Sequence, residues 1–383
     1  MKKILVPMFC LCSFIAYSQA IFQPSYSSPG GTYSNPVFLA PTSGGNWGTN
    51  SSFVNNANNP WNQSPGNSTT SYIKAQGATF MPAFISRMKE YDSLIKNNPR
   101  DTAAYWNRAV NRFTLNMVSG AIADFNKIIE IDPKRIDAYF GIAYAKMSQQ
   151  EFSEAIKSLD KVIAMEPKFA EAYLYRAKSK IAIEDYKGAI ADYDLLMPMI
   201  APNSFVYCRR GFAKSSIKDQ QGAMADYNKA IEIDPKSADA YYNRANEKMD
   251  QQDLNGAIED YTKVIKIKPE ISEAYFNRAV AENQLHDYKA AISDYKKVIK
   301  INPDDEAAYF NRAVIYYSQN NYKDAVADLD KAIIADPKYA DAYYTRGIVK
   351  IASGDKDGGC FDLQSAINLG YEKAKEQKKK NCE

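Results

Sequence analysis

A 34-residue period runs through most of this 383-residue chain and limits what it can fold into. An alanine recurs at this interval seven times, as Ala121, Ala155, Ala189, Ala223, Ala257, Ala291 and Ala325. Prolines keep the same interval, and only Pro202 is displaced, by one residue. Self-similarity of this length predicts a repeat architecture, in which each copy is one supersecondary unit that buries its apolar face against its neighbours.

Each copy is predicted to form two helices joined by a short turn. In the copy that begins at Ala238, apolar residues recur at helical spacing over 238–249 and again over 256–267. Ala245 and Ala257 are small enough to let the two helix backbones approach closely. Pro269 ends the second helix, because proline lacks the backbone donor and clashes with a helix interior.

The pattern closely resembles the tetratricopeptide repeat, whose signature is W-x2-L-G-x2-Y, then A-x3-F, then P. Tyrosine fills the first slot in every copy, as Tyr105, Tyr139, Tyr173, Tyr207, Tyr241, Tyr275, Tyr309 and Tyr343. The A-x3-F element appears, for example, from Ala121 to Phe125 and from Ala257 to Tyr261.

The resemblance implies an all-α fold, a right-handed superhelical solenoid of about eight helix-turn-helix repeats with capping helices at both ends. We expect an N-terminal capping helix within 81–101, eight repeats over 102–373 and the end of a closing helix at 374–383. In this family the first helix of each repeat lines a concave groove.

An arginine replaces the leucine of the family signature in seven of the copies, as Arg108, Arg176, Arg210, Arg244, Arg278, Arg312 and Arg346. An aspartate follows each arginine by sixteen residues, as Asp124, Asp192, Asp226, Asp260, Asp294, Asp328 and Asp362. The remaining copy has Ile142 and Ser158 at these positions and so lacks both charges. We therefore predict structural ion pairs between the two helices of a copy, for example Arg244–Asp260, Arg278–Asp294 and Arg312–Asp328. The alternative is that the arginines bind an acidic ligand.

Helical spacing from the tyrosine slot nominates residues that would face the groove. These candidate groove residues are Trp106, Asn107, Phe140, Tyr144, Arg209, Phe212, Tyr242, Asn243, Asn246, Phe276, Asn277, Phe310, Asn311 and Tyr344. Aromatic rings and carboxamides suit an extended peptide or a partner helix. The alternative is that the aromatic side chains pack neighbouring copies together. Only Lys178 and Arg209 supply cations here, so the family's clamp for a C-terminal carboxylate is not carried over.

Composition argues against several other functions. The formal net charge of +3 does not suit a protein that binds nucleic acid through its phosphates. His286 is the only histidine, is expected in an exposed turn, and makes histidine-based catalysis or metal binding a poor prediction. The sequence has no phosphate-binding loop, Cys-x-x-Cys pair or nucleophile elbow. We expect no enzyme activity, no cofactor and no metal.

The first twenty residues have the pattern of a secretory signal peptide, with two lysines, an apolar run and small residues at its end. A membrane anchor is the alternative, but the run is short and contains Pro7. We expect an exported protein, periplasmic, cell-surface or secreted, with no membrane span after cleavage. Cys208, Cys360 and Cys382 would remain, and Cys360 could pair with Cys382 in an oxidising compartment.

Residues 21–80 are rich in Ser, Asn, Gly and Pro, and Lys74 is their only charged residue. We expect a disordered or extended segment. The whole pattern predicts an exported, non-enzymatic scaffold that binds a peptide or partner protein. One alternative is a structural or self-assembling envelope component whose aromatic N-terminal segment occupies the groove. Another is an accessory subunit of a secretion or envelope enzyme complex.

Overall fold

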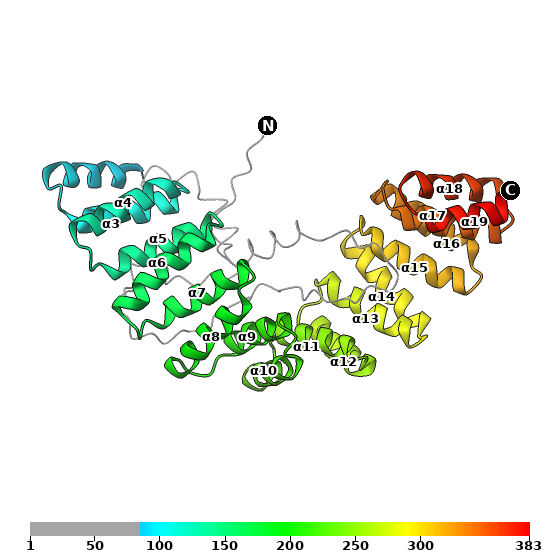
Figure 1. The fold of residues 1–383 in the computed structure, drawn as a ribbon, viewed down its shortest axis with the longest axis horizontal. Coiled ribbons are helices and arrows are strands. Elements are labelled where there is room, and N and C mark those ends of the chain that lie inside the picture. The colour runs from blue at the N-terminus through cyan, green and yellow to red at the C-terminus, as the bar shows by residue number, and fades with distance from the viewer. Residues whose placement is uncertain (1–84) are drawn as a thin grey trace. The chain divides into compact units, whose positions relative to one another are not determined.

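The computed structural model describes residues 85–383, which form helices and turns with no strand among them (Figure 1). Residues 85–97 are helical. The helices that follow form eight hairpins: α3 Thr102–Thr114 and α4 Val118–Ile131; α5 Ile136–Ser148 and α6 Phe152–Met165; α7 Ala170–Ala182 and α8 Tyr186–Leu196; α9 Ser204–Ser216 and α10 Gln220–Ile233; α11 Ala238–Asp250 and α12 Leu254–Ile267; α13 Ser272–Gln284 and α14 Tyr288–Ile301; α15 Glu306–Ser318 and α16 Tyr322–Ala335; α17 Ala340–Ala352 and α18 Lys356–Asn368. The short 3-10 helix η2 Met197–Met199 follows α8, and α19 Lys373–Cys382 closes the chain.

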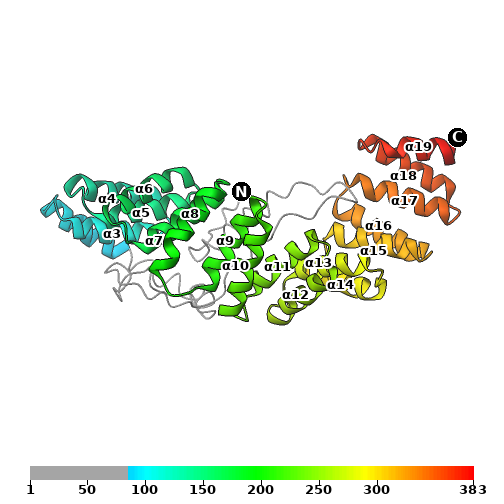
Figure 2. The same cartoon turned by 60° about the horizontal axis from the view of Figure 1, so that its bottom comes forward.

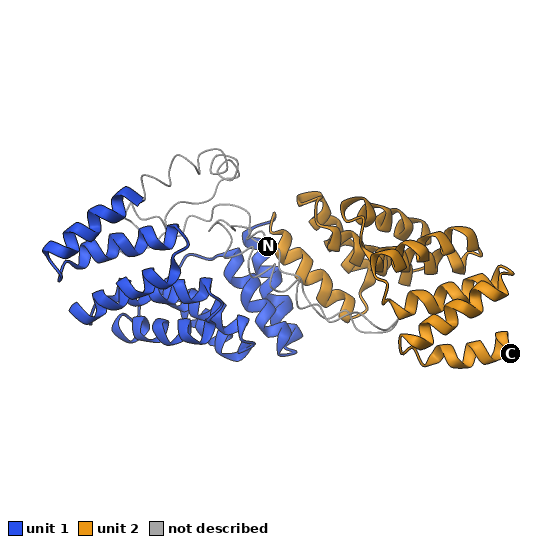
Figure 3. Ribbon diagram, turned by 90° about the horizontal axis from the view of Figure 1, so that it is seen from above, with its two compact units in different colours: residues 1–22, 39–235 blue, residues 23–38, 236–383 orange. Residues whose placement is uncertain are grey.

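The described residues divide into two compact units, 85–235 and 236–383 (Figure 3). The first unit holds α3 to α10 and the second holds α11 to α19. Within each unit every helix packs against the helices before and after it in the chain, as the successive hairpins in Figure 2 show. Each unit is therefore a stack of hairpins, which is the solenoid arrangement that the repeat predicts.

The repeated alanine forms the centre of each hairpin. All seven alanines of the 34-residue series are 0% exposed, as expected of small residues where two helices approach closely. Four residues later stands a fully buried ring or leucine, as Phe125, Leu159, Tyr193, Tyr227, Tyr261, Tyr295 and Leu329. Burial of these side chains drives the hairpins together, because each large apolar side chain removed from water contributes about 1.5–3 kcal/mol.

The turn inside each hairpin has the same backbone geometry throughout. Seven turns place a non-glycine residue at positive φ, namely Asn116, Gln150, Glu184, Lys218, Gln252, His286 and Asn320, and the eighth uses Gly354. In most hairpins a side chain caps the N-terminus of the second helix. In α12, for example, Asp253 Oδ1 accepts a hydrogen bond from the Gly256 backbone N–H at 3.0 Å.

Helix boundaries agree closely with those expected from sequence. The copy read as 238–249 and 256–267 forms α11 and α12 over 238–250 and 254–267. The helical residues 85–97 lie at the place of the expected N-terminal cap, and α19 lies at that of the closing helix. Pro198 ends α8 early and lies within η2, shortly before the displaced Pro202. None of the helices within 85–383 combines the length and apolar character needed to cross a membrane.

The C-terminal helix is tied to the stack by a disulfide between Cys360 of α18 and Cys382 of α19. Leu363, Ala366 and Ala374 form the small apolar cluster between the two helices. Cys208 is buried and free. The expected signal peptide at 1–20 and the low-complexity segment at 21–80 lie outside the described residues.

Candidate functional site

Each arginine of the repeated series forms a two-pronged ion pair with the aspartate sixteen residues later. In the α11/α12 hairpin, Arg244 Nε donates to Asp260 Oδ2 at 2.8 Å and Nη2 donates to Oδ1 at 2.7 Å. The same two bonds join Arg108, Arg176, Arg210, Arg278, Arg312 and Arg346 to their aspartates. The hydrogen bond to Asp260 raises the pKa of Arg244, against the lowering effect of burial. The geometry is that of the predicted pairs, so each of these aspartates is engaged by an arginine of its own hairpin.

The arginine stem also covers apolar surface, because its guanidinium lies over the tyrosine three residues earlier. The distance from Arg244 Cζ to the centre of the Tyr241 ring is 5.5 Å. In the α5/α6 hairpin, Ile142 is buried in place of the arginine, and Ser158 bonds to the Glu154 carbonyl of its own helix. This copy thus lacks both members of the pair, and Lys146, one turn after Ile142, pairs with Glu151 at 2.6 Å.

Most of the paired aspartates have a second cation, which the sequence reading did not predict. Lys248, one turn after Arg244, places Nζ 2.9 Å from Asp260 Oδ2 and also donates to the Gly256 carbonyl. Arg112, Lys180, Lys214 and Lys350 occupy the same position in other hairpins. Asp260 is 3% exposed, so two cations compensate its buried charge.

The α13/α14 hairpin reverses this arrangement. Glu282 stands where the second cation would be, with Oε1 3.7 Å from Arg278 Nε. Its Oε2 is buried and bonds to nothing within the described residues. Two carboxylates, Glu282 and Asp294, therefore share one guanidinium. Burial raises the pKa of Glu282 to about 7, nearby Asp294 adds to the rise, and Arg278 partly opposes it.

The structure corrects the prediction for part of the candidate groove. Five of the predicted residues are buried within the stack: Phe140, Phe212, Tyr242, Asn243 and Phe310. Phe140 packs edge-on against Phe169, at the start of the next hairpin, with ring centres 5.3 Å apart. Tyr242 and Asn243 are each only 1% exposed. Helical spacing could not show this, because the face beside the tyrosine slot also faces the next hairpin.

The other candidate groove residues keep part of their surface: Trp106, Asn107, Tyr144, Arg209, Asn246, Phe276, Asn277, Asn311 and Tyr344. Several are held in place by neighbours. Asn277 Nδ2 donates to the Tyr242 hydroxyl of the preceding hairpin at 2.9 Å. The Tyr261 hydroxyl donates to Asn246 Oδ1 at 2.6 Å. These carboxamides and rings thus form a semi-exposed, ordered surface on the first helices.

The two cations of this surface lie over aromatic rings. Lys178 Nζ is 5.0 Å from the centre of the Tyr175 ring and 5.2 Å from that of Phe205, and Arg209 Cζ is 5.0 Å from Phe205. His286 lies exposed in the turn between α13 and α14, as expected, with Nδ1 2.9 Å from the Tyr288 hydroxyl. No group of acidic, histidine and cysteine side chains within 85–383 is arranged to hold a metal ion.

The chain is similar to several proteins with solved structures. The C-terminal part of a TPR repeat-containing protein from Cytophaga hutchinsonii aligns over 60% of this chain and 95% of its own, with 18% identity and a TM-score of 0.54. A tetratricopeptide repeat protein from Parabacteroides merdae aligns over 64% and 97%, with 21% identity and a TM-score of 0.47. YrrB, described as a TPR protein with an unusual peptide-binding site, aligns over 48% and 95%, with 21% identity and a TM-score of 0.41. The first of these supports the fold. No curated protein matches the chain.

Models of the repeat itself match the sequence directly. The tetratricopeptide repeat model matches three consecutive segments, 238–271, 272–305 and 306–339. A second model, TPR repeat, matches 216–246, and a third, again named tetratricopeptide repeat, matches 115–181. These segments contain most members of the alanine series and several of the tyrosine and proline series described above, and each 34-residue match covers one hairpin. The chain is a multi-repeat member of the tetratricopeptide repeat family.

Proposed function

We propose that this protein is an exported, non-enzymatic scaffold that binds a partner protein or peptide along its first helices. The observation that carries the proposal is the row of semi-exposed rings and carboxamides there. In the second unit this row contains Phe276, Asn277, Asn311 and Tyr344, and it recurs from one hairpin to the next. Carboxamides can both donate to and accept from a peptide backbone, and rings can cover its side chains.

The order of this surface supports a binding role. The Phe276 ring packs against Tyr295 with centres 5.6 Å apart, and the Tyr344 ring packs against Tyr371 at 4.8 Å. Asn277 is oriented by its bond to Tyr242. Side chains already held in one conformation lose little entropy when a partner binds, so more of the contact energy remains as affinity.

The non-enzymatic part of the proposal rests on the sequence inventory. The one histidine, His286, lies in an exposed turn. The buried acids of the repeated series are engaged by arginines of their own hairpin. Proteins of this repeat family act through their surfaces, and the fold supports that reading here.

Export is supported by two features. Residues 1–20 have the composition of a secretory signal peptide. Cys360 and Cys382 form a disulfide, and disulfides persist chiefly in oxidising compartments outside the cytoplasm. Fractionation of cells that express the full chain, followed by mass determination of its N-terminus, tests this part. Retention in the cytoplasm with residues 1–20 intact would refute it.

The binding proposal is tested by affinity capture from envelope extract. We compare the full chain with an Asn277→Ala, Asn311→Ala, Tyr344→Ala variant, which changes semi-exposed side chains and spares the buried Phe310. A Lys263→Ala, Lys297→Ala, Lys331→Ala variant, altered on the second helices, is the control. Circular dichroism and thermal melting first show that both variants fold. Proteins retained by the full chain and the control, and lost by the first variant, are the expected result. Capture of the same set by all three would contradict the proposal.

Deletion of residues 21–80 distinguishes this proposal from the alternative in which that segment occupies the surface. If the segment competes with partners, its deletion raises their affinity or changes the oligomeric state. If capture and oligomeric state are unchanged, the surface binds outside partners alone.

A further inference from the structure

The residue sixteen positions before each arginine determines how one hairpin is joined to the next. At four junctions this residue is an aspartate, and Nη1 of the arginine donates to it. The four pairs and their distances are Arg108–Asp92 at 2.7 Å, Arg176–Asp160 at 2.6 Å, Arg210–Asp194 at 2.5 Å and Arg346–Asp330 at 2.6 Å. One guanidinium thus binds an aspartate of its own hairpin and another of the helix that precedes this hairpin.

The α14/α15 junction breaks this rule by charge reversal. Lys296 of α14 occupies the position of the missing aspartate, sixteen residues before Arg312. Arg312 bonds to Asp328 through Nε and Nη2, and its Nη1 finds no acceptor within residues 85–383. Both helices belong to the second unit. At this junction the two residues are both cations, Lys296 and Arg312, whereas at four other junctions they are an aspartate and an arginine.

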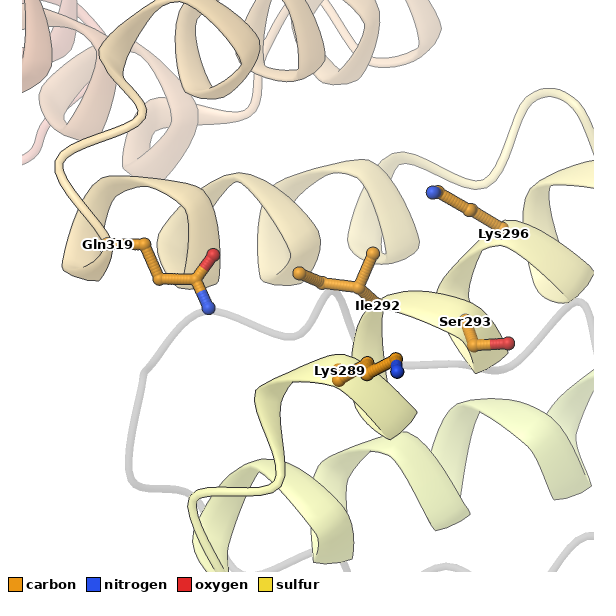
Figure 4. Close-up of a pocket in the computed structure, with 5 residues that line it drawn as sticks. All are labelled: Lys289, Ile292, Ser293, Lys296 and Gln319. Carbon is orange, nitrogen blue, oxygen red and sulfur yellow. The ribbon is translucent and has the colours of Figure 1, made fainter.

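An open groove of about 410 Å³ lies along the same junction, lined by Lys289, Ile292, Ser293, Lys296 and Gln319 (Figure 4). Four of these residues come from α14, and Gln319 caps the end of α15. The two lysines have no ion-pair partner in the described part of the chain. We call this feature the α14/α15 groove. It offers two ammonium groups, a hydroxyl and a carboxamide beside one apolar side chain, which suits an anionic group on a chain.

The surroundings of the groove are basic as well. Lys289, Lys296, Lys297 and Lys300 are all exposed on α14. The only carboxylate on that helix is Asp294, which is buried and bound by Arg278. A surface of one sign attracts and orients partners of the opposite sign.

We propose that the α14/α15 groove docks an acidic segment of a partner polypeptide. One carboxylate takes the place of the missing aspartate, between Lys296 and Arg312, as the carboxylates do at the four regular junctions. A second carboxylate meets Lys289, two helix turns away, about 10 Å along α14. In a peptide with the polyproline II conformation, side chains three residues apart lie on the same face, about 9 Å apart.

The segment must come from another chain. Residues 21–80 contain no aspartate or glutamate, so this part of the protein cannot supply the carboxylates. The groove is formed mainly by a second helix, whereas the proposed partner surface is on the first helices. The two proposals are therefore independent, and either can fail alone.

The experiment uses the full chain and a fluorescein-labelled peptide with two aspartates three residues apart in a neutral Gly/Ser background. Binding is measured by fluorescence anisotropy at low salt. In Lys296→Asp the protein's own carboxylate takes the position that the peptide carboxylate would occupy. We therefore expect the affinity for the peptide to fall at least tenfold, which corresponds to the loss of one charge-assisted hydrogen bond. Lys297→Asp makes the same change of net charge on the same helix but outside the groove, and should retain most of the affinity.

A gain-of-function variant sharpens the test. Asp330→Lys removes the regular aspartate at the α16/α17 junction and frees Nη1 of Arg346. Combined with Lys296→Asp, it should restore peptide binding at a second place. Equal losses in Lys296→Asp and Lys297→Asp would show a general charge effect and overturn the proposal, as would absence of binding by the unaltered chain.

Two further measurements test other occupants of the α14/α15 groove. Inorganic phosphate or vesicles with anionic headgroups could bind with the same dependence on Lys296. If either binds as tightly as the peptide, a phosphate group and not a polypeptide is the ligand. Sedimentation at low salt tests a second copy of the chain. Self-association that Lys296→Asp abolishes would assign the groove to that copy and overturn the proposal of a foreign partner.

Discussion

The hairpins α11/α12 and α13/α14 are neighbours in one unit, with the same helix lengths, turn and arginine–aspartate pair, yet they balance their buried charge in opposite ways. In α11/α12 one carboxylate, Asp260, is held by two cations, Arg244 and Lys248. In α13/α14 one cation, Arg278, is shared by two carboxylates, Asp294 and Glu282. The difference arises from a single position, one turn after the arginine.

This comparison shows that the position one turn after the arginine can hold a charge of either sign. The fold accepts either because the arginine and its aspartate keep the two helices in register. The consequence appears in the response to mutation and pH. A buried charge without a partner costs more than the pair contributes, so the two hairpins should be sensitive to loss of opposite members.

The largest expected effect is this reversal of sensitivity. Arg278→Ala leaves two buried carboxylates without a cation and should cost about 3–5 kcal/mol, whereas Asp294→Ala leaves Arg278 beside Glu282 and should cost less. In α11/α12 the order inverts, because Asp260→Ala removes the carboxylate that compensates both Arg244 and Lys248, while Arg244→Ala leaves Asp260 with Lys248. The melting temperatures of the four single variants give the order of destabilisation in each hairpin. The same order in both hairpins would contradict the interpretation.

The double variant Arg244→Ala, Asp260→Ala is the control for coupling. If the two residues act as a pair, the double variant should be less destabilised than the sum of the single variants. Additive shifts in melting temperature would show that the two side chains contribute separately.

A smaller effect concerns pH. Glu282 has its pKa raised to about 7 in the folded chain, against an ordinary value of 4.5. Because the folded state favours the protonated form, the contribution is complete below about pH 4.5 and is lost as pH rises to about 7. After a discount for residual solvent exposure we expect the loss to be about 1–2 kcal/mol. Melting temperature measured between pH 5 and 8 should fall more in the unaltered chain than in Glu282→Gln.

Glu282→Lys converts the α13/α14 hairpin to the charge pattern of α11/α12. It should raise the melting temperature at pH 8 and remove the same part of the pH dependence. The reciprocal change, Lys248→Glu, should introduce a similar pH dependence into α11/α12. If neither exchange transfers the behaviour, the position after the arginine is not its cause.

The smallest effect lies in the turns, where the two hairpins agree. Gln252 and His286 both have φ of 61°, a left-handed conformation that costs a residue with a Cβ atom more than it costs glycine. Gln252→Gly should stabilise the chain by about 0.5–1 kcal/mol. Gly354→Gln, at the corresponding turn before α18, should destabilise it by a similar amount. Chemical denaturation resolves both, and a loss of stability in Gln252→Gly would contradict the strain argument.

Much of the fold could be predicted because the repeat provides its own internal comparison. The alanine and tyrosine series identified the helix contacts, and the joint absence of charge at Ile142 and Ser158 pointed to the pairing of Arg244 with Asp260 before any contact was seen. A pattern repeated eight times averages out local exceptions.

The candidate site was less predictable, because helical spacing indicates a face of a helix and does not tell what covers it. Tyr242 and Phe310 are on the expected face and are nevertheless buried by neighbours. The link from Arg346 back to Asp330 was missed, although acids also recur sixteen residues before the arginines. The Glu282 carboxylate was missed because a charged residue one turn after an arginine usually reads as a surface pair.

The disulfide between Cys360 and Cys382 makes the C-terminal end of the second unit harder to open. Stacked hairpins open from their ends, where each helix has a neighbour on one side only. At the C-terminal end, a covalent bond holds α19 against α18. For as long as the bond is oxidised, α19 cannot leave the stack alone, and unravelling from this end must release α18 and α19 together.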